Sequence, residues 1–359
     1  MTHVNKGWEQ SLMMSLFGAE ASFDAGVLIG GDKACSLVGY EFEPGWPDVI
    51  TNDKGEVTGK EHGYTQEITQ YGFEATYKEA HAKPNSLAGL AALILGAISS
   101  TQDGAFTAYK HLITPVSIGT ALPSMHVEHL KGGLQYKYTG VMGQSLKLLG
   151  EAGGYVNMEA ALLGSGTRAV SATAFAAAIT ESWLKLSSMK IWVESGAEID
   201  ITAMASRVQG AENISSGTPD DMGTVLKNFD FTWNNNLTGQ PGAGGDGVLQ
   251  GIDYGRRAAE MKLGFLQTSG DELAYYTGQE VVAIELNLKG AQIDTASPGG
   301  EMYYGLDLII PRCKIKAAPL PQGGVDDDLT QEYDVEIFDD GTNSPVEIIV
   351  YNAQAAYMS

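Results

Sequence analysis

The feature that most constrains the fold of this chain is a two-residue alternation of apolar and polar side chains. Residues 71–77 place tyrosine, phenylalanine or alanine at every second position, and 259–265, 282–288, 304–310 and 333–337 repeat this period. Successive side chains of a β-strand point to opposite faces, so the period is typical of strands that are buried on one side. The sequence therefore predicts a mainly β protein.

Further strands and tight turns are expected between these segments. Paired glycines stand where hairpin turns are needed, at 132–133 and 153–154, because glycine accepts the positive φ of such turns. The chain holds 45 glycines in 359 residues, which fits many turns and long loops. The additional strands are predicted over 106–113, 125–130, 134–138, 145–149, 155–163 and 189–193.

Helical patterns are few and short. Residues 87–96 share one apolar face, with Ser86 as the expected N-cap and Gly96 as the expected stop. A second short helical piece is expected over 272–276. The alanine-rich stretch 169–186 is interpreted as a linker helix between two halves of the chain.

The order of these elements repeats along the chain. Strand, helix and further strands follow one another in both halves, separated by close to half the chain length, so an internal duplication is inferred. The predicted organisation is two tandem β-sandwich or barrel modules, each with a short flanking α-helix. The first, with an N-terminal arm, covers 1–175, and the second covers 176–359. Residues 1–65 are interpreted as the arm or long loops with some strand.

The charge balance limits the possible partners. A formal net charge of −22 opposes binding to nucleic acid, which relies on Lys and Arg, but suits a surface past which DNA slides. Cys35 and Cys313 are expected to be reduced thiols of a protein made in a cytosol. No secretory signal is apparent, and the longest apolar run, 87–97, is shorter than the roughly 20 residues of a membrane span. The chain is expected to be soluble.

Three patterns could suggest a chemical site, and each has a simpler interpretation. The glycines of 242–247 fit a dinucleotide motif, but no apolar helical pattern follows them, so a flexible loop is predicted. His126 and His129 lie three apart on a predicted strand and would point to opposite faces, which predicts surface histidines rather than metal ligands. The acid-rich run 326–340 lacks calcium-loop spacing and is interpreted as a solvated face.

No catalytic, cofactor-binding or metal-binding residue is therefore assigned. Nucleophile elbows, phosphate-binding loops and zinc-protease helices are absent from the sequence. Carboxylates paired in space for acid–base work stay open, because such pairs are invisible in a sequence. We expect a protein that is not an enzyme and needs no cofactor.

A series of short segments follows in order between residues 65 and 350. These are 87–96, Ala-Leu-Pro-Ser-Met-His-Val-Glu at 121–128, Tyr-Lys-Tyr-Thr-Gly at 136–140, 155–166 ending in Leu-Leu-Gly-Ser-Gly, Asn-Phe-Asp-Phe-Thr-Trp-Asn-Asn-Asn-Leu at 228–237, Gly-Arg-Arg at 255–257, Leu-Ile-Ile-Pro-Arg at 308–312 and Leu-Thr-Gln-Glu-Tyr at 329–333. In this order they resemble the major tail tube proteins of long-tailed bacteriophages. Residues 1–65 lie outside the resemblance.

The resemblance implies a structural virion protein that is synthesised in the host cytoplasm. Modules of this family join into rings of six whose inner strands form a continuous barrel around the lumen, and the rings stack. Two modules per chain would make a ring of three copies, and one module a ring of six. The implied partners are further copies of the chain and the tape measure, tail-tip and tail terminator proteins, with DNA passing through unbound.

Two other classes of protein stay open at this point. A capsid decoration or tail-fibre-like protein would also be acidic and β-rich, but would not polymerise into tubes. A β-sandwich enzyme or carbohydrate-binding module would need aromatic side chains gathered on one face. The five tryptophans are instead scattered along the chain, at Trp8, Trp46, Trp183, Trp192 and Trp233.

Overall fold

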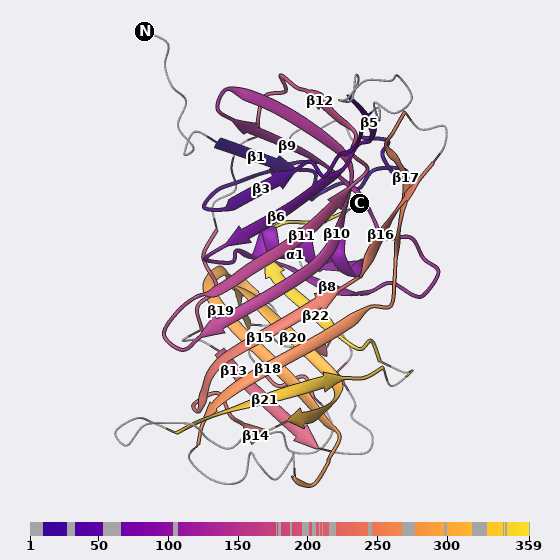
Figure 1. Ribbon diagram of the computed structural model, residues 1–359. Helices are drawn as coiled ribbons and strands as arrows, with labels where there is room; N and C mark the ends of the chain where they lie inside the picture. The colour runs from indigo at the N-terminus through magenta and orange to yellow at the C-terminus, as the bar shows by residue number, and fades with distance from the viewer. Residues whose placement is uncertain are drawn as a thin grey trace.

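The structure is a computed structural model in which antiparallel strands dominate, as the alternation predicts (Figure 1). It describes residues 10–26, 33–52, 66–102, 107–176, 178, 181–186, 189–195, 201–202, 206–207, 209, 211–214, 220–242, 246–267, 277–297, 300–317, 329–339, 341 and 343–358.

The first half of the chain carries twelve of the described strands. They are β1 (Gln10–Met14), β2 (Cys35–Leu37), β3 (Glu41–Gly45), β4 (Val49–Asn52), β5 (Gln66–Gln70), β6 (Phe73–Glu79), β7 (Gly96–Gln102), β8 (Tyr109–Pro115), β9 (Met125–Lys131), β10 (Leu134–Glu151), β11 (Val156–Gly164) and β12 (Arg168–Val170).

The second half continues with strands of similar kind. They are β13 (Met189–Ser195), β14 (Asp220–Asp221), β15 (Leu226–Asn234), β16 (Leu237–Pro241), β17 (Leu249–Tyr254), β18 (Ala258–Leu266), β19 (Val282–Ser297), β20 (Gly300–Ala317), β21 (Thr330–Ile337) and β22 (Glu347–Asn352).

One prediction about the strands is wrong. The stretches 134–138 and 145–149 are not two strands, because β10 runs through both without interruption. It bends where its register with β9 shifts between Tyr138 and Val141, and Gly140 has a positive φ of 62° there. The bend lets one strand serve two surfaces: its first part pairs with β9, and its last part pairs with β11. The glycine turns at 132–133 and 153–154 are confirmed, and Gly132, Gly133 and Gly153 have positive φ values there.

A long antiparallel sheet connects the two halves. Its strands lie in the order β3, β6, β11, β10, β15, β18, β21 and the end of β20, and Figure 1 shows most of them one below another. The step from the first to the second half is the pairing of β10 with β15, from Ser145 opposite Asn234 to Glu151 opposite Asn228. The halves are therefore joined by backbone hydrogen bonds.

The helix α1 (Pro84–Leu95) lies at the centre of the molecule, and every residue in it is buried. Proline at its first turn and Gly96 beyond its end delimit it, since Gly96 adopts a φ of 96° and donates its N–H to the carbonyl of Ala92. A helix that is apolar on all sides is stable only inside a core. Strands β7, β8, β10, β20 and β22 surround it.

The predicted N-cap at Ser86 is wrong. The helix begins three residues earlier than expected, at Pro84, and its N-cap is Lys83, whose side chain does not cap it. Carboxylates outside the helix accept hydrogen bonds from the N–H groups at its start. The N–H of Lys83 donates to Glu79 Oε2 at 3.2 Å, and that of Asn85 donates to Glu181 Oε2 at 2.6 Å. Burial raises the pKa of Glu181 to about 8. Sequence pattern could not reveal a cap supplied from about 100 residues away.

One further expectation about the chain's organisation needs correction. The described residues of 169–186 form no α-helix, because their backbone bonds to other segments: the N–H of Ser171 donates to the carbonyl of Gln135, and that of Leu184 to the carbonyl of Ala82. Residues 1–65 are predicted to be an arm or long loops with some strand, and β1 is such a strand: it pairs with β2 and β9 and buries its apolar side chains. The predicted helix 272–276 lies outside the described residues.

The two histidines expected at the surface are buried. His126 is 6 % and His129 is 3 % exposed. They do face opposite sides of β9: the His126 ring lies 3.5 Å from Glu128, and the His129 ring packs edge-on against Phe42. Burial, with a smaller contribution from Lys131, lowers the pKa of His129 to about 4.

This burial predicts a loss of stability in mild acid. The unfolded chain takes up a proton on His129 near pH 6.5 and the folded chain only near pH 4, so stability falls as pH drops through this window. We expect His129→Phe to reduce the difference in unfolding free energy between pH 7.5 and pH 5 by about 1–2 kcal/mol. Urea denaturation at the two pH values measures it, and an unchanged difference would contradict the assignment.

Candidate functional site

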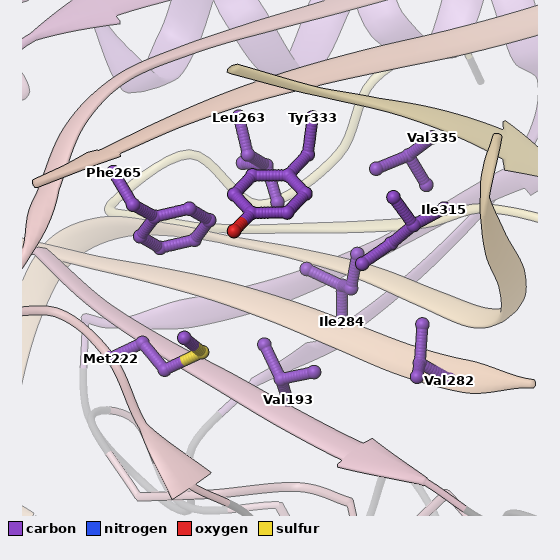
Figure 2. A pocket seen from close by; sticks show the side chains of 9 residues that line it. All are labelled: Val193, Met222, Leu263, Phe265, Val282, Ile284, Ile315, Tyr333 and Val335. Atoms are coloured by element: carbon purple, nitrogen blue, oxygen red, sulfur yellow. The ribbon is translucent and has the colours of Figure 1, made fainter. Parts of the chain in front are cut away.

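The enclosed space in the second half is no site for chemistry. Figure 2 shows apolar side chains pointing toward one another inside it, among them Leu263, Phe265, Ile284 and Tyr333. The cavity is about 20 Å³, and its lining offers almost no polar atoms to a ligand. A space of this size and polarity holds neither a substrate nor a well-bonded water. It is part of the core.

The most distinctive surface is the polar face of the long sheet. On it, lysines and carboxylates alternate across the strands: Lys78 contacts Glu159 at 3.8 Å, Lys147 contacts Asp230 at 2.9 Å, and Lys262 contacts Asp334 at 3.5 Å. Pairs this exposed add little stability. They do limit repulsion between neighbouring carboxylates in an acidic chain.

Carboxylates nevertheless outnumber lysines on this face. The register of the strands puts the acids of β21 there, which confirms the predicted solvated acidic face for the described part of 326–340. The acids on the face are Glu41, Glu43, Glu74, Glu151, Glu159, Asp230, Glu260, Glu332, Asp334 and Glu336, and the lysines are Lys78, Lys147, Lys262 and Lys314.

Two buried carboxylates of the second half are candidates for a pair that could do acid–base chemistry. Asp307 and Glu285 are completely buried, and each accepts hydrogen bonds from neighbours: Tyr351 and Asn287 donate to Asp307, and Asn213 donates to Glu285. Burial raises the pKa of both carboxyl groups. Both side chains are buried and cannot contact a substrate. The hydrogen bonds from Asn213 to Glu285 instead attach the segment around residue 213 to the sheet.

The structure also shows where the glycine motif and the two cysteines lie. Residues 242 and 246–247 belong to the turn between β16 and β17, so the loop interpretation of the glycine motif is confirmed there, and a strand follows it rather than a helix. Cys35 and Cys313 are free and buried. Among the described residues, no group of His, Cys, Asp and Glu could hold a metal ion, and no helix is long and apolar enough to cross a membrane.

The two ends of the long sheet are open. Strand β3 pairs with β6 on one side only, and the last four residues of β20 (314–317) pair only with β21, as far as the described strands extend. Unpaired strand edges are templates for a further strand. The sequence did not reveal β3, because this short strand contains Pro44 and Gly45.

Asn235 fixes the junction between the halves. It is completely buried, and its Nδ2 donates to the carbonyls of Ile94 (2.6 Å) and Gly143 (2.9 Å), while its Oδ1 accepts from the Trp233 indole (2.9 Å). One side chain thus ties the end of α1, the middle of β10 and the end of β15. Space is tight here, since a Cβ on Gly143 would lie 2.2 Å from Ile94.

Open strand edges and a charged sheet face are features of a protein suited to self-assembly. A family model described as phage tail tube protein matches residues 73–337, from the start of β6 to the end of β21. The chain belongs to this family, and its role is that of a structural tail tube protein. No curated protein matches it significantly.

Asn235→Ala tests the junction. The change leaves two buried carbonyls without a donor, and we expect it to lower the free energy of unfolding by about 2–4 kcal/mol. Thr238→Ala, at an exposed position of β16, is the control and should change it by less than about 0.5 kcal/mol. Thermal or urea denaturation measures both. Equal effects of the two changes would refute the role assigned to Asn235.

Proposed function

We propose that three copies of this chain close into a ring, and that stacked rings form the hollow tube through which phage DNA passes. In this proposal each chain supplies two tandem modules, 1–175 and 176–359, so three chains give a pseudo-sixfold ring. Family membership supports the tube, and the repeated strand order supports the two modules.

The observation that carries the proposal is this repeat. The pairings among the first set of strands recur in the same order among the second set: β1, β3, β6, β9, β10, β11 and β12 correspond to β13, β15, β18, β19, β20, β21 and β22. The long sheet is thus the four-strand order β3–β6–β11–β10 followed by β15–β18–β21–β20. Its internal junction joins the last strand of one unit to the first strand of the next.

The same junction can form between chains. The free end of β20 corresponds to the part of β10 that pairs with β15, and the free edge of β3 corresponds to β15. Pairing β20 of one chain with β3 of the next would continue the antiparallel alternation of the sheet. A curved sheet that closes in this way removes all its edges.

Charges at the two open edges favour the same contact. At the internal junction Lys147, opposite Glu159 of β11, forms an ion pair with Asp230 of β15. Lys314 of β20 holds the matching place, opposite Glu336 of β21. The carboxylates that would meet Lys314 across the ring contact are those of β3, Glu41 and Glu43.

We place the charged face of the sheet toward the lumen. Its excess of carboxylates would repel DNA phosphates and let the DNA slide without specific contacts. The remaining partners in this proposal are the tape measure, tail-tip and tail terminator proteins, and the chain, made in the host cytoplasm, carries out no catalysis.

Electron microscopy of the concentrated protein tests the proposal. Hollow tubes whose class averages along the axis show three copies per ring are expected. Rings of six copies would overturn the two-module assignment. Monodisperse particles that never polymerise, even with tail-tip seeds, would overturn self-assembly into a tube.

A charge exchange tests the strand contact. Lys314→Glu should raise the protein concentration needed for assembly by about tenfold or more, because it opposes like charges across the ring contact. Adding Glu41→Lys and Glu43→Lys should restore assembly. Turbidity and electron microscopy measure it, with circular dichroism to verify that each monomer is folded. Failure of the exchange to restore assembly in folded protein would refute this strand pairing.

A further inference from the structure

The hairpin formed by β4 and β5 exposes apolar side chains. Val49 is 49 %, Ile50 is 50 % and Ile68 is 42 % exposed, and Ile50 and Ile68 lie opposite each other in the hairpin. Three half-exposed branched side chains on one short hairpin cost solvation and mark a contact surface.

A second hairpin, β16–β17, occupies the matching place in the other half. The first hairpin is inserted between β3 and β6, and the second between β15 and β18, with connections of only two or three residues at each end. Figure 1 shows β16 and β17 extending from the second half along the first half, beside β5. The two hairpins are counterparts in the repeated strand order.

The second hairpin buries its apolar side chains against the first half of its own chain. Leu249 and Ile252 are 6 % and 7 % exposed and form one cluster with Leu122 and Met142, with Leu163 packed against it. The hairpin is further held by the N–H of Leu249, which donates to the carbonyl of Ser165 at 2.8 Å. The contact lies next to the β10–β15 junction.

We infer that the β4–β5 hairpin packs on the second half of a neighbouring copy of this chain, as β16–β17 packs on the first half within one chain. The inference rests on the proposed ring. The receiving surface follows from the register: Ser145 and Ala161 lie next to Met142 and Leu163 on one face of the sheet. With Lys147 and Glu159 matched to Lys314 and Glu336, the place of Ser145 and Ala161 is taken in the second half by Arg312 and Phe338. This places Val49, Ile50 and Ile68 against Phe338 and its neighbourhood.

That receiving surface suits an apolar partner. Phe338 is half-buried in the single chain, so it keeps apolar surface available for contact. The N–H of Phe338 donates to the carbonyl of Arg312 at 3.0 Å, which holds the end of β21 against β20. The free end of β20, where β3 of the next chain is proposed to pair, lies beside it.

A photo-activated cross-linker at residue 50 or 68 tests this contact in the full chain. Under assembling conditions, irradiation should join two chains, and mass spectrometry should find the link in a peptide containing 310–317 or 330–339. A link to any other region, or within one chain only, would overturn the inference.

Substitution gives an independent measurement. Ile50→Asn with Ile68→Asn should raise the concentration needed for assembly by about tenfold or more, since the side chains are buried only in the assembly. Ile50→Val with Ile68→Val is the matched control and should assemble within about threefold of the parent protein. Both variants should melt like the parent as monomers. Equal assembly of the Asn and Val variants would overturn the inference.

The outcomes for the hairpin and for the ring are separable. Threefold tubes formed by a protein whose hairpin links elsewhere would refute the hairpin contact and leave the ring intact. A parent chain that forms no tube would refute the ring, whatever the hairpin variants do.

Discussion

The fold depends on the pairing of β10 with β15. Seven consecutive residue pairs join strands from the two halves of the chain, and Asn235 anchors their end to the helix α1. Without this junction, β10 and β15 would each expose an unpaired edge, and the apolar hairpin β16–β17 would lose the surface on which it packs. The β10–β15 hydrogen bonds, the buried Asn235 side chain and the apolar contact of the hairpin thus lie side by side. Each of them helps to fix the alignment of the two strands.

In a chain with 44 acidic and 22 basic residues, neighbouring carboxylates repel one another unless they are separated or paired. The polar face of the sheet does so by setting a lysine between carboxylates on neighbouring strands, which lowers local repulsion without neutralising the face. The buried carboxylates are handled differently. Asp307, Glu285 and Glu181 accept hydrogen bonds from neighbours, and burial raises the pKa values of their carboxyl groups.

Local pattern was enough to predict what is local. The strands around 73–79, 258–266 and 330–337 follow from alternation. Gly96 ends the helix, and Gly132, Gly133 and Gly153 mark turns, because their positive φ values favour glycine. Pattern failed where a distant partner decides. Alanine-rich 169–186 gives its hydrogen bonds to Gln135 and Ala82 instead of forming a helix, and His129 is buried because Phe42 covers it. The open edges of the sheet also could not be predicted from local pattern, because a strand is an edge only when no other strand pairs with it.

Open edges create a hazard, since any exposed strand can pair with a wrong partner. Here each edge is limited: β3 is five residues long and contains Pro44, and the free end of β20 spans four residues. So short an edge offers few hydrogen bonds, and selective pairing needs additional contacts. A lysine matched to carboxylates and an apolar hairpin beside the edge would supply them only when the partner is another copy in the correct register. Weak edges combined with matched neighbours thus favour ordered assembly over aggregation.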